Sequence, residues 1–294
     1  HCNTLPSFVP SDTVVCIGDT VLFYNTTTVG KRCFEDWYIN NTLVPGNIDT
    51  LPFVFYTAGI QQIQLIAECG NTTDTNTTYI NVIPPPVASF TSTTVCLNNT
   101  TQFTNTSTTQ GTIDSSYWDF GNGSPVINSP NPIYTYSDSG SYNATLITQS
   151  SFGCSDTVSN TVRVYGLPVA AFSQQNVCVS DSMSFADTST PNAGATISDH
   201  SWTFGDGATA IVQHPKHKYA AAGTYTVTLI VTTNNGCKDT ISQNVIVHPL
   251  PQPQFTTGNV CYGDYAQFTE SSAIASTDTL QSWLWNFGDG SPVL

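Results

Sequence analysis

The sequence predicts an all-β fold built from β-sandwich modules in tandem. A Val-Cys pair recurs as Val95-Cys96, Val177-Cys178 and Val260-Cys261, at spacings of 82 and 83 residues. Polar and apolar residues alternate after each pair, as in Thr101–Asn105, and a period of two indicates half-buried strands. Nine cysteines without a C-x-x-C pair favour a disulfide framework formed in an oxidising compartment.

Each repeat next carries the motif W-x-F-G-[DN]-G. A Trp and a Phe two positions apart share one face of a strand, where they can anchor two packed sheets, and the Gly-Asp-Gly run tolerates a tight turn. We therefore expect the aromatic residues of all three copies to belong to the core: Trp118, Phe120, Trp202, Phe204, Trp285 and Phe287.

Two copies continue with Y-x-x-x-G-x-Y-x-[AV]-T-L, which reaches a Gly-Cys pair eight residues after its Leu. A last strand then leads into a Pro-containing linker, which should be semi-rigid. The predicted modules span residues 1–86, 87–168, 169–252 and 253–294. The first is a divergent copy, in which Phe55 and Gly59 match the Tyr and Gly of this motif. The fourth stops soon after its turn, so we expect the parent chain to continue.

Composition limits the function. The chain has 6 Lys+Arg against 20 Asp+Glu, a net charge of -14, which would repel a phosphate backbone and argues against nucleic acid as a partner. No apolar run approaches the ~18 residues that a membrane span needs. No sequence motif of a hydrolase, metalloprotease or nucleotide-binding enzyme occurs, and the chain has only three Glu residues. We expect no catalytic site and no cofactor.

The two joined motifs resemble those of the polycystic-kidney-disease (PKD) domain family. The resemblance covers nearly the whole chain and implies seven-stranded, immunoglobulin-like sandwiches, arranged here as an extended rod. It also implies that Tyr142 and Tyr225 begin core strands next to a Gly corner, as tyrosine corners do in related sandwiches.

The cysteines fit this scheme if each module joins its own Val-Cys to its own Gly-Cys. The expected disulfides are Cys96 to Cys154 and Cys178 to Cys237, each closing a loop of about 60 residues, which chain entropy rates at ~4 kcal/mol. In the first module Cys16 to Cys69 is the analogous pair and Cys2 to Cys33 the remaining one, although four cysteines allow three pairings. Cys261 would find its partner beyond Leu294.

Some PKD modules bind calcium, which makes Asp206 and Asp289 in the G-D-G turns the candidate calcium ligands. A lone turn Asp more often accepts hydrogen bonds from its own backbone amides, and that structural interpretation is preferred. The histidines of His214-Pro215-Lys216-His217 are likewise interpreted as structural.

A triplet of Asp, then Ser or Thr, then an aliphatic residue resembles the O-glycosylation sequon of secreted Bacteroidota proteins. Asp-Thr is also ordinary turn chemistry, so both interpretations stay open. The candidate acceptors are Thr13, Thr20, Thr50, Thr157, Ser182, Thr240 and Thr279.

Arrays of such modules look like the giant surface adhesins of Bacteroidota, including those of gliding motility and type IX secretion. This resemblance implies an extracellular stalk that spaces a binding region from the cell, with further PKD modules, surface glycans or other surface proteins as partners. The alternatives are spacer modules of a secreted chitinase, cellulase or protease, or the subunit of a self-assembling filament.

Overall fold

The computed structural model describes residues 5–28, 33–45, 48–275 and 278–290. The regular structure in these ranges is all strand, which confirms the all-β prediction. No helix in the described ranges is long and apolar enough to cross a membrane. The chain divides into two compact units, His1–Val164 and Tyr165–Leu294, and each is described by itself.

The first unit begins with a sandwich of a three-stranded sheet, β1-β3-β6, and a five-stranded sheet, β2-β8-β7-β4-β5. Phe23 and Trp37 lie fully buried between the two sheets, together with Ile63, Leu65 and Ile80. The strands are β1 (Phe8–Pro10), β2 (Val14–Cys16), β3 (Thr20–Asn25), β4 (Cys33–Ile39), β5 (Thr42–Val44), β6 (Thr50–Val54), β7 (Gly59–Cys69) and β8 (Thr72–Ile83).

The same unit contains a second sandwich, with sheets β14-β11-β9 and β10-β16-β15-β12-β13. Trp118, Phe120 and Phe103 are fully buried in its core. Its strands are β9 (Phe90–Ser92), β10 (Val95–Cys96), β11 (Thr101–Asn105), β12 (Ile113–Asp119), β13 (Ile127–Asn128), β14 (Ile133–Tyr134), β15 (Gly140–Ser150) and β16 (Ser155–Tyr165).

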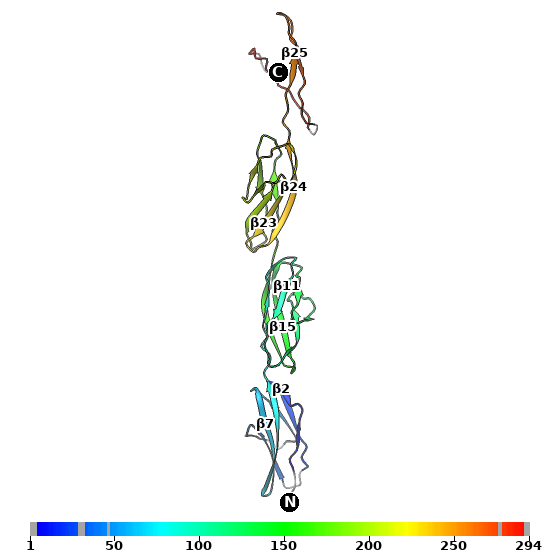
Figure 1. Cartoon of the computed structure of the whole chain (residues 1–294). Helices are drawn as coiled ribbons and strands as arrows, with labels where there is room; N and C mark the ends of the chain where they lie inside the picture. The colour runs from blue at the N-terminus through cyan, green and yellow to red at the C-terminus, as the bar shows by residue number, and fades with distance from the viewer. Residues whose placement is uncertain (1–4, 29–32, 46–47, 276–277, 291–294) are drawn as a thin grey trace. The chain divides into compact units, whose positions relative to one another are not determined.

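The second unit repeats this topology with sheets β17-β19-β22 and β18-β24-β23-β20-β21, around buried Trp202, Phe204 and Phe185. Figure 1 shows the long hairpin β23–β24 that dominates the larger sheet. The strands are β17 (Phe172–Gln174), β18 (Val177–Cys178), β19 (Met183–Asp187), β20 (Ile197–Thr203), β21 (Thr209–Ala210), β22 (Lys216–His217), β23 (Gly223–Thr233) and β24 (Lys238–His248).

One strand in each sandwich is divided between the two sheets. In the third module Phe172–Gln174 pairs antiparallel with β19, whereas Val177-Cys178 crosses to the other sheet and runs parallel to the end of β24, with Cys178 opposite His248. In the first module Cys16 lies opposite Ile83 in the same way. The Val-Cys pair therefore lies at the end of the module from which the chain leaves.

The Gly-Cys turn lies at the other end. It connects the two long strands β15 and β16, or β23 and β24, at the end where the chain enters the module. The carboxylate of Asp156, two residues after Cys154, accepts the N–H of Ala88 at 2.8 Å, and Asp239 accepts the N–H of Ala170 at 2.8 Å. Ala88 and Ala170 lie at the start of their modules, directly after Val87 and Val169, which bridge to Thr108 and Thr190, so these bonds hold the turn beside the entry.

The fourth copy contains only one strand pair among the described residues, β25 (Phe255–Thr257) with β26 (Phe268–Glu270). Trp285 is half-buried and Phe287 is 40% exposed, so the prediction that these two residues lie in a core is wrong for this chain. No strand equivalent to β23 or β24 of the third module occurs among the described residues of the fourth copy.

Candidate functional site

No group of three or more His, Cys, Asp or Glu side chains that could hold a metal ion occurs in the described part of the chain. Three His–Asp pairs lie within hydrogen-bond distance in the described ranges: His200 with Asp187, His217 with Asp206 and His248 with Asp278.

Asp206 lies in the turn that follows β20, and protein donors occupy its carboxylate. One oxygen accepts the N–H of Ala208 at 3.0 Å, and the other lies 2.7 Å from Nε2 of His217, whose ring stacks on Phe204 at 4.3 Å. Burial raises the pKa of Asp206, whereas the hydrogen bonds from His217 and Ala208 lower it. The hydrogen bonds together outweigh burial, so the pKa lies below its usual value. This arrangement fixes the turn, and the calcium site at Asp206 and Asp289 stays a prediction.

Asp187 ends β19, and its side chain is almost fully buried. Its Oδ2 lies 2.9 Å from Nε2 of His200 and accepts a hydrogen bond from Gln213 at 3.2 Å, while Oδ1 accepts the N–H of Ser189 at 2.9 Å. Desolvation raises the pKa of Asp187, and these hydrogen bonds together lower it below its usual value. Asn105 is the equivalent residue of the second module, because it lies opposite Phe90 as Asp187 lies opposite Phe172. Asp and Asn thus both occur at this position, which indicates a structural role.

Tyrosine hydroxyls close the corner of the second and third modules. Buried Tyr219 donates to the carbonyl of Phe204 at 3.0 Å, as Tyr136 does to Phe120. Burial raises the pKa of Tyr219 to about 12. Tyr225, half-buried, stacks on Tyr219 at 4.1 Å and donates to the carbonyl of Ala221 at 2.9 Å.

Tyr142 behaves like Tyr225. It stacks on Tyr136 at 4.0 Å and donates to the carbonyl of Asp138 at 2.7 Å. In the first module Phe55 takes the place of Tyr136 and is equally buried, but it has no hydroxyl to donate. The corner tyrosines therefore stabilise the fold through stacking and hydrogen bonds to the backbone.

The disulfides differ from those expected. Cys16 bonds to Cys154, across the joint between the first and second modules, and Cys33 bonds to Cys69. The predicted pairs Cys96 to Cys154, Cys16 to Cys69 and Cys2 to Cys33 are therefore wrong. Cys2 itself lies outside the described residues.

The predicted pair Cys178 to Cys237 is also wrong, because Cys178 is a free thiol. Cys96 and Cys237 are both disulfide-bonded. In the described part of the chain, Cys178 and Cys261 are the free cysteines.

The length of the strands explains the correction. Cys178 lies opposite His248, while Cys237 directly precedes Lys238, at the other end of the 11-residue strand β24. Eleven residues of strand span about 35 Å, whereas a disulfide requires Cα atoms within ~7 Å. A bond between the Val-Cys and the Gly-Cys of one module is therefore impossible in this topology.

Cys69 of the first module is not equivalent to Cys154 and Cys237. Cys69 follows Leu65 by four residues, whereas Cys154 and Cys237 follow their Leu by eight. Cys69 is therefore the last residue of β7, directly opposite Cys33 on β4, with Cα atoms 4.3 Å apart. This difference in spacing was the signal in the sequence that could have identified the pair.

The joint between the first two modules is the strongest candidate for a functional feature. Cys154 is buried there, and its Sγ lies 4.0 Å from the carbonyl of Ile83, the last residue of β8. That carbonyl also accepts the N–H of Ile17 at 3.0 Å, next to Cys16. The chain thus leaves the first module beside a covalent bond to the second.

All seven candidate O-glycosylation residues are exposed: Thr13, Thr20, Thr50, Thr157, Ser182, Thr240 and Thr279. The aspartates before Thr157 and Thr240 are the ones that hold the module entry, so the Asp-Thr pair has a structural role at these two sites. Glycosylation at these residues stays a prediction.

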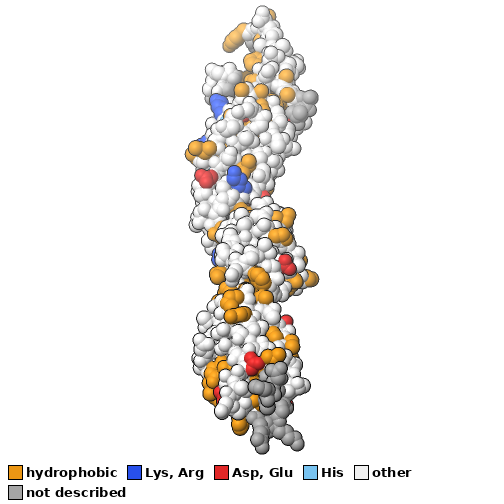
Figure 2. Space-filling model, turned by 60° about the horizontal axis from the view of Figure 1, so that its bottom comes forward, with side chains coloured by type: hydrophobic (Ala, Val, Ile, Leu, Met, Phe, Trp, Pro, Cys, Tyr) orange, Lys and Arg blue, Asp and Glu red, His pale blue; other side chains and the backbone are white. Residues whose placement is uncertain are grey.

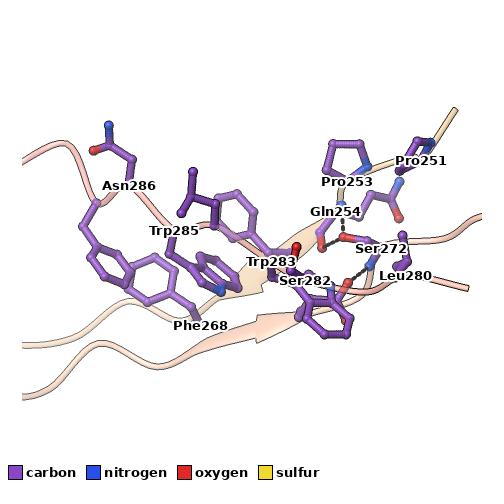
Figure 3. A pocket seen from close by; sticks show the side chains of 14 residues that line it. Pro251, Pro253, Gln254, Phe268, Ser272, Leu280, Ser282, Trp283, Trp285 and Asn286 are labelled. Atoms are coloured by element: carbon purple, nitrogen blue, oxygen red, sulfur yellow. Dashed lines mark hydrogen bonds between the residues drawn. The ribbon is translucent and has the colours of Figure 1, made fainter. Parts of the chain in front are cut away.

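The fourth copy presents an exposed aromatic face, defined as Phe255, Phe268, Trp283, Trp285 and Phe287. The face borders an open pocket of about 600 Å³, with Pro251 and Pro253 on its rim. Figure 3 shows the two Trp side chains and Phe268 around this pocket.

Charged groups are sparse elsewhere on the surface, and Figure 2 shows one largely uncharged face with scattered apolar groups.

Comparison with known families agrees with this architecture. A family model described as PKD domain matches residues 83–164 and 166–248, which is more than half of the chain. A microbial collagenase from Vibrio alginolyticus is 32% identical over 72 residues, which are 24% of this chain and 9% of the collagenase. The chain thus spans a small part of that relative.

Two solved domains are similar to part of this chain. The PKD1 domain of the Vibrio cholerae metalloprotease PrtV is 34% identical and covers 28% of this chain and 96% of its own, with a TM-score of 0.26. The PKD1 domain of Vibrio anguillarum Epp is 31% identical and covers 28% of this chain and 93% of its own, also with a TM-score of 0.26.

Proposed function

We propose that this chain, which belongs to the PKD-domain family, is a non-catalytic stalk segment of a large secreted protein of the cell surface. In this role it holds a binding region away from the cell. The observation that carries the proposal is the disulfide Cys16–Cys154. It joins two modules that each have a complete core, so its position restrains the joint.

The rest of the structure supports a spacer. The first three modules have well-packed aromatic cores. The described residues contain no group of three or more His, Cys, Asp or Glu side chains that could hold a metal ion. Six of the described cysteines are disulfide-bonded, as expected of a protein that folds in an oxidising compartment, and this supports an extracellular location. Its immediate partners would be further modules of the same chain, and the binding region would contact surface glycans or proteins.

Exposed Thr and Ser residues in Asp-containing triplets make the stalk a candidate glycoprotein. We expect the intact mass of the protein from its source to exceed that of the bare sequence. Substitution of the seven candidate residues with Ala should remove the excess, and an unmodified mass of the natural protein would contradict this part of the proposal.

A stalk is tested by replacing it. In the parent protein, residues 87–252 would be deleted in one variant and exchanged for two unrelated immunoglobulin-like modules in another. We expect the purified deletion variant to bind its target normally while cells that display it attach poorly, and the unrelated modules should restore attachment. Loss of target binding by the purified deletion variant would show instead that these modules bind the target themselves.

A second candidate function is that of a spacer in a secreted hydrolase, because the matched proteins include a microbial collagenase and a metalloprotease. The sequence of the parent gene on both sides of this segment separates the two functions. A neighbouring catalytic domain would establish the hydrolase, whereas many more modules followed by a surface-sorting domain would establish the stalk.

A further inference from the structure

We propose that Cys178 forms a disulfide with a cysteine in the Gly-Cys turn of the module that follows it, so that this joint is closed as the first joint is. The partner cysteine would belong to a part of the parent protein outside the given sequence. Such a bond is independent of the stalk function, because spacer modules of a hydrolase could carry it too.

Cys178 occupies the position at which the first module is bonded. Cys16 lies opposite Ile83, whose carbonyl accepts the N–H of Ile17 at 3.0 Å. Cys178 lies opposite His248, whose carbonyl accepts the N–H of Val179 at 2.9 Å. The two cysteines thus have the same register and the same backbone bond at the exit of their modules, and Cys16 is bonded to the next module.

The other cysteines of the second unit cannot serve as this partner. Cys237 is already disulfide-bonded and lies at the opposite end of β24. Cys261 belongs to the Val-Cys pair of the fourth copy, a position that lies at the exit end of a module, far from the entry that adjoins Cys178. Cys16 is bonded to Cys154, which lies in the Gly-Cys turn of the following module. The equivalent partner for Cys178 is therefore a cysteine in the Gly-Cys turn of the module that follows the third.

The exposed aromatic face indicates where that turn would come from. Phe255 packs edge-on against Trp285 with ring centroids 5.4 Å apart at 72°, and the corresponding pair Phe172 and Trp202 gives 5.2 Å and 69°. Phe268 lies 5.0 Å from Phe287, and Phe185 lies 5.3 Å from Phe204. The fourth copy thus already has the aromatic arrangement of half a sandwich core.

In the third module the hairpin β23–β24 covers the equivalent aromatic rings. Its contacting side chains are Leu229, Val231, Val245 and Val247. We infer that an equivalent hairpin of the parent chain occupies the exposed aromatic face. In the second and third modules the turn of this hairpin contains the Gly-Cys pair and is held beside the module entry. The same turn in the fourth module would therefore lie next to the exit of the third, where Cys178 is.

Formation of the bond is an ordinary two-electron oxidation. The two thiols lose two protons and two electrons as the S–S bond forms, and a disulfide-containing oxidant, such as a thiol oxidoreductase of the secretory compartment, is reduced to its dithiol.

The test extends the chain with its own following residues to the end of the fourth module. The oxidised protein is alkylated without reductant and digested, and its linked peptides are identified by mass spectrometry. We expect Cys178 to be joined to a new cysteine in the hairpin turn, while Cys261 is alkylated. In a matched Cys178→Ser variant, the new cysteine should become alkylated.

Two results would overturn the proposal: an alkylated Cys178 in the extended chain, or a bond between the new cysteine and Cys261. Tryptophan fluorescence shows whether the extended module folds, because burial of Trp283 and Trp285 should shift their emission to the blue. If it does not fold, the same peptide analysis on the parent protein from its source gives the answer, and a free Cys178 there refutes the bond.

Discussion

Replacement of Cys16 and Cys154 with Ser should lengthen the chain that force can extract from the first two modules by about 350 Å. With the disulfide intact, tension passes directly from Cys16 to Cys154, and the residues between them cannot extend. The two cysteines are 138 residues apart, and Cys33–Cys69 holds 36 of these, which leaves 102 residues to be released. At ~3.5 Å per extended residue this gives ~350 Å.

Single-molecule force spectroscopy on the whole chain measures this length. The experiment uses a Cys96→Ser/Cys237→Ser background, because those two cysteines are also disulfide-bonded. The nested bond provides the control. Replacement of Cys33 and Cys69 alone should add nothing, because both lie inside the bypassed segment, whereas their replacement together with Cys16 and Cys154 should add a further ~125 Å.

Equal contour lengths with and without Cys16 and Cys154 would refute the bond across the joint. So would a gain in length from the Cys33 and Cys69 replacements alone, since this would show that tension already passes through the first module.

Three further outcomes follow from the third module, and each is measured as its free energy of unfolding by denaturant titration. Gly205→Ala should destabilise the module by clearly more than Gly207→Ala: both residues have positive φ, which costs ~1–2 kcal/mol for an L residue, but a Cβ at Gly205 would lie 2.6 Å from a backbone oxygen while one at Gly207 meets nothing. Equal losses would contradict the close approach. Tyr219→Phe should cost ~1–3 kcal/mol because it leaves a buried carbonyl without its donor, and a neutral substitution would show that water replaces the hydroxyl. Because the pKa of Asp187 is lowered in the folded state, its contribution is present above the unfolded pKa of ~3.9 and is lost as pH falls below it. The Asp187→Asn variant should therefore lose less stability between pH 5 and pH 2 than the parent chain, and parallel curves would contradict this.

Much of the fold followed from local patterns in the sequence. The W-x-F-G motif identified Trp118 and Trp202, which the structure buries completely, and the match of Phe55 to Tyr136 located the corner of the divergent first module. These features depend on neighbours within one strand or one turn, which alternation and turn chemistry reveal. The network around Asp187 gave no such signal, because its partners His200 and Gln213 come from separate segments.

The predicted pairing of Val-Cys with Gly-Cys within one module is wrong because of the length of the hairpin strands. These strands separate the Val-Cys and Gly-Cys pairs by the full height of a sandwich. The correct partner of Cys16 depends on how consecutive modules meet, and no repeat within a single module encodes that contact.

Peptide mapping of the oxidised chain without reduction tests the central claim most directly, because the joint between modules is where the structure departs from a simple series of separate domains. The account predicts a peptide containing Cys16 linked to one containing Cys154, with Cys33 linked to Cys69. A bond from Cys154 to Cys96, or from Cys16 to Cys69, would contradict it.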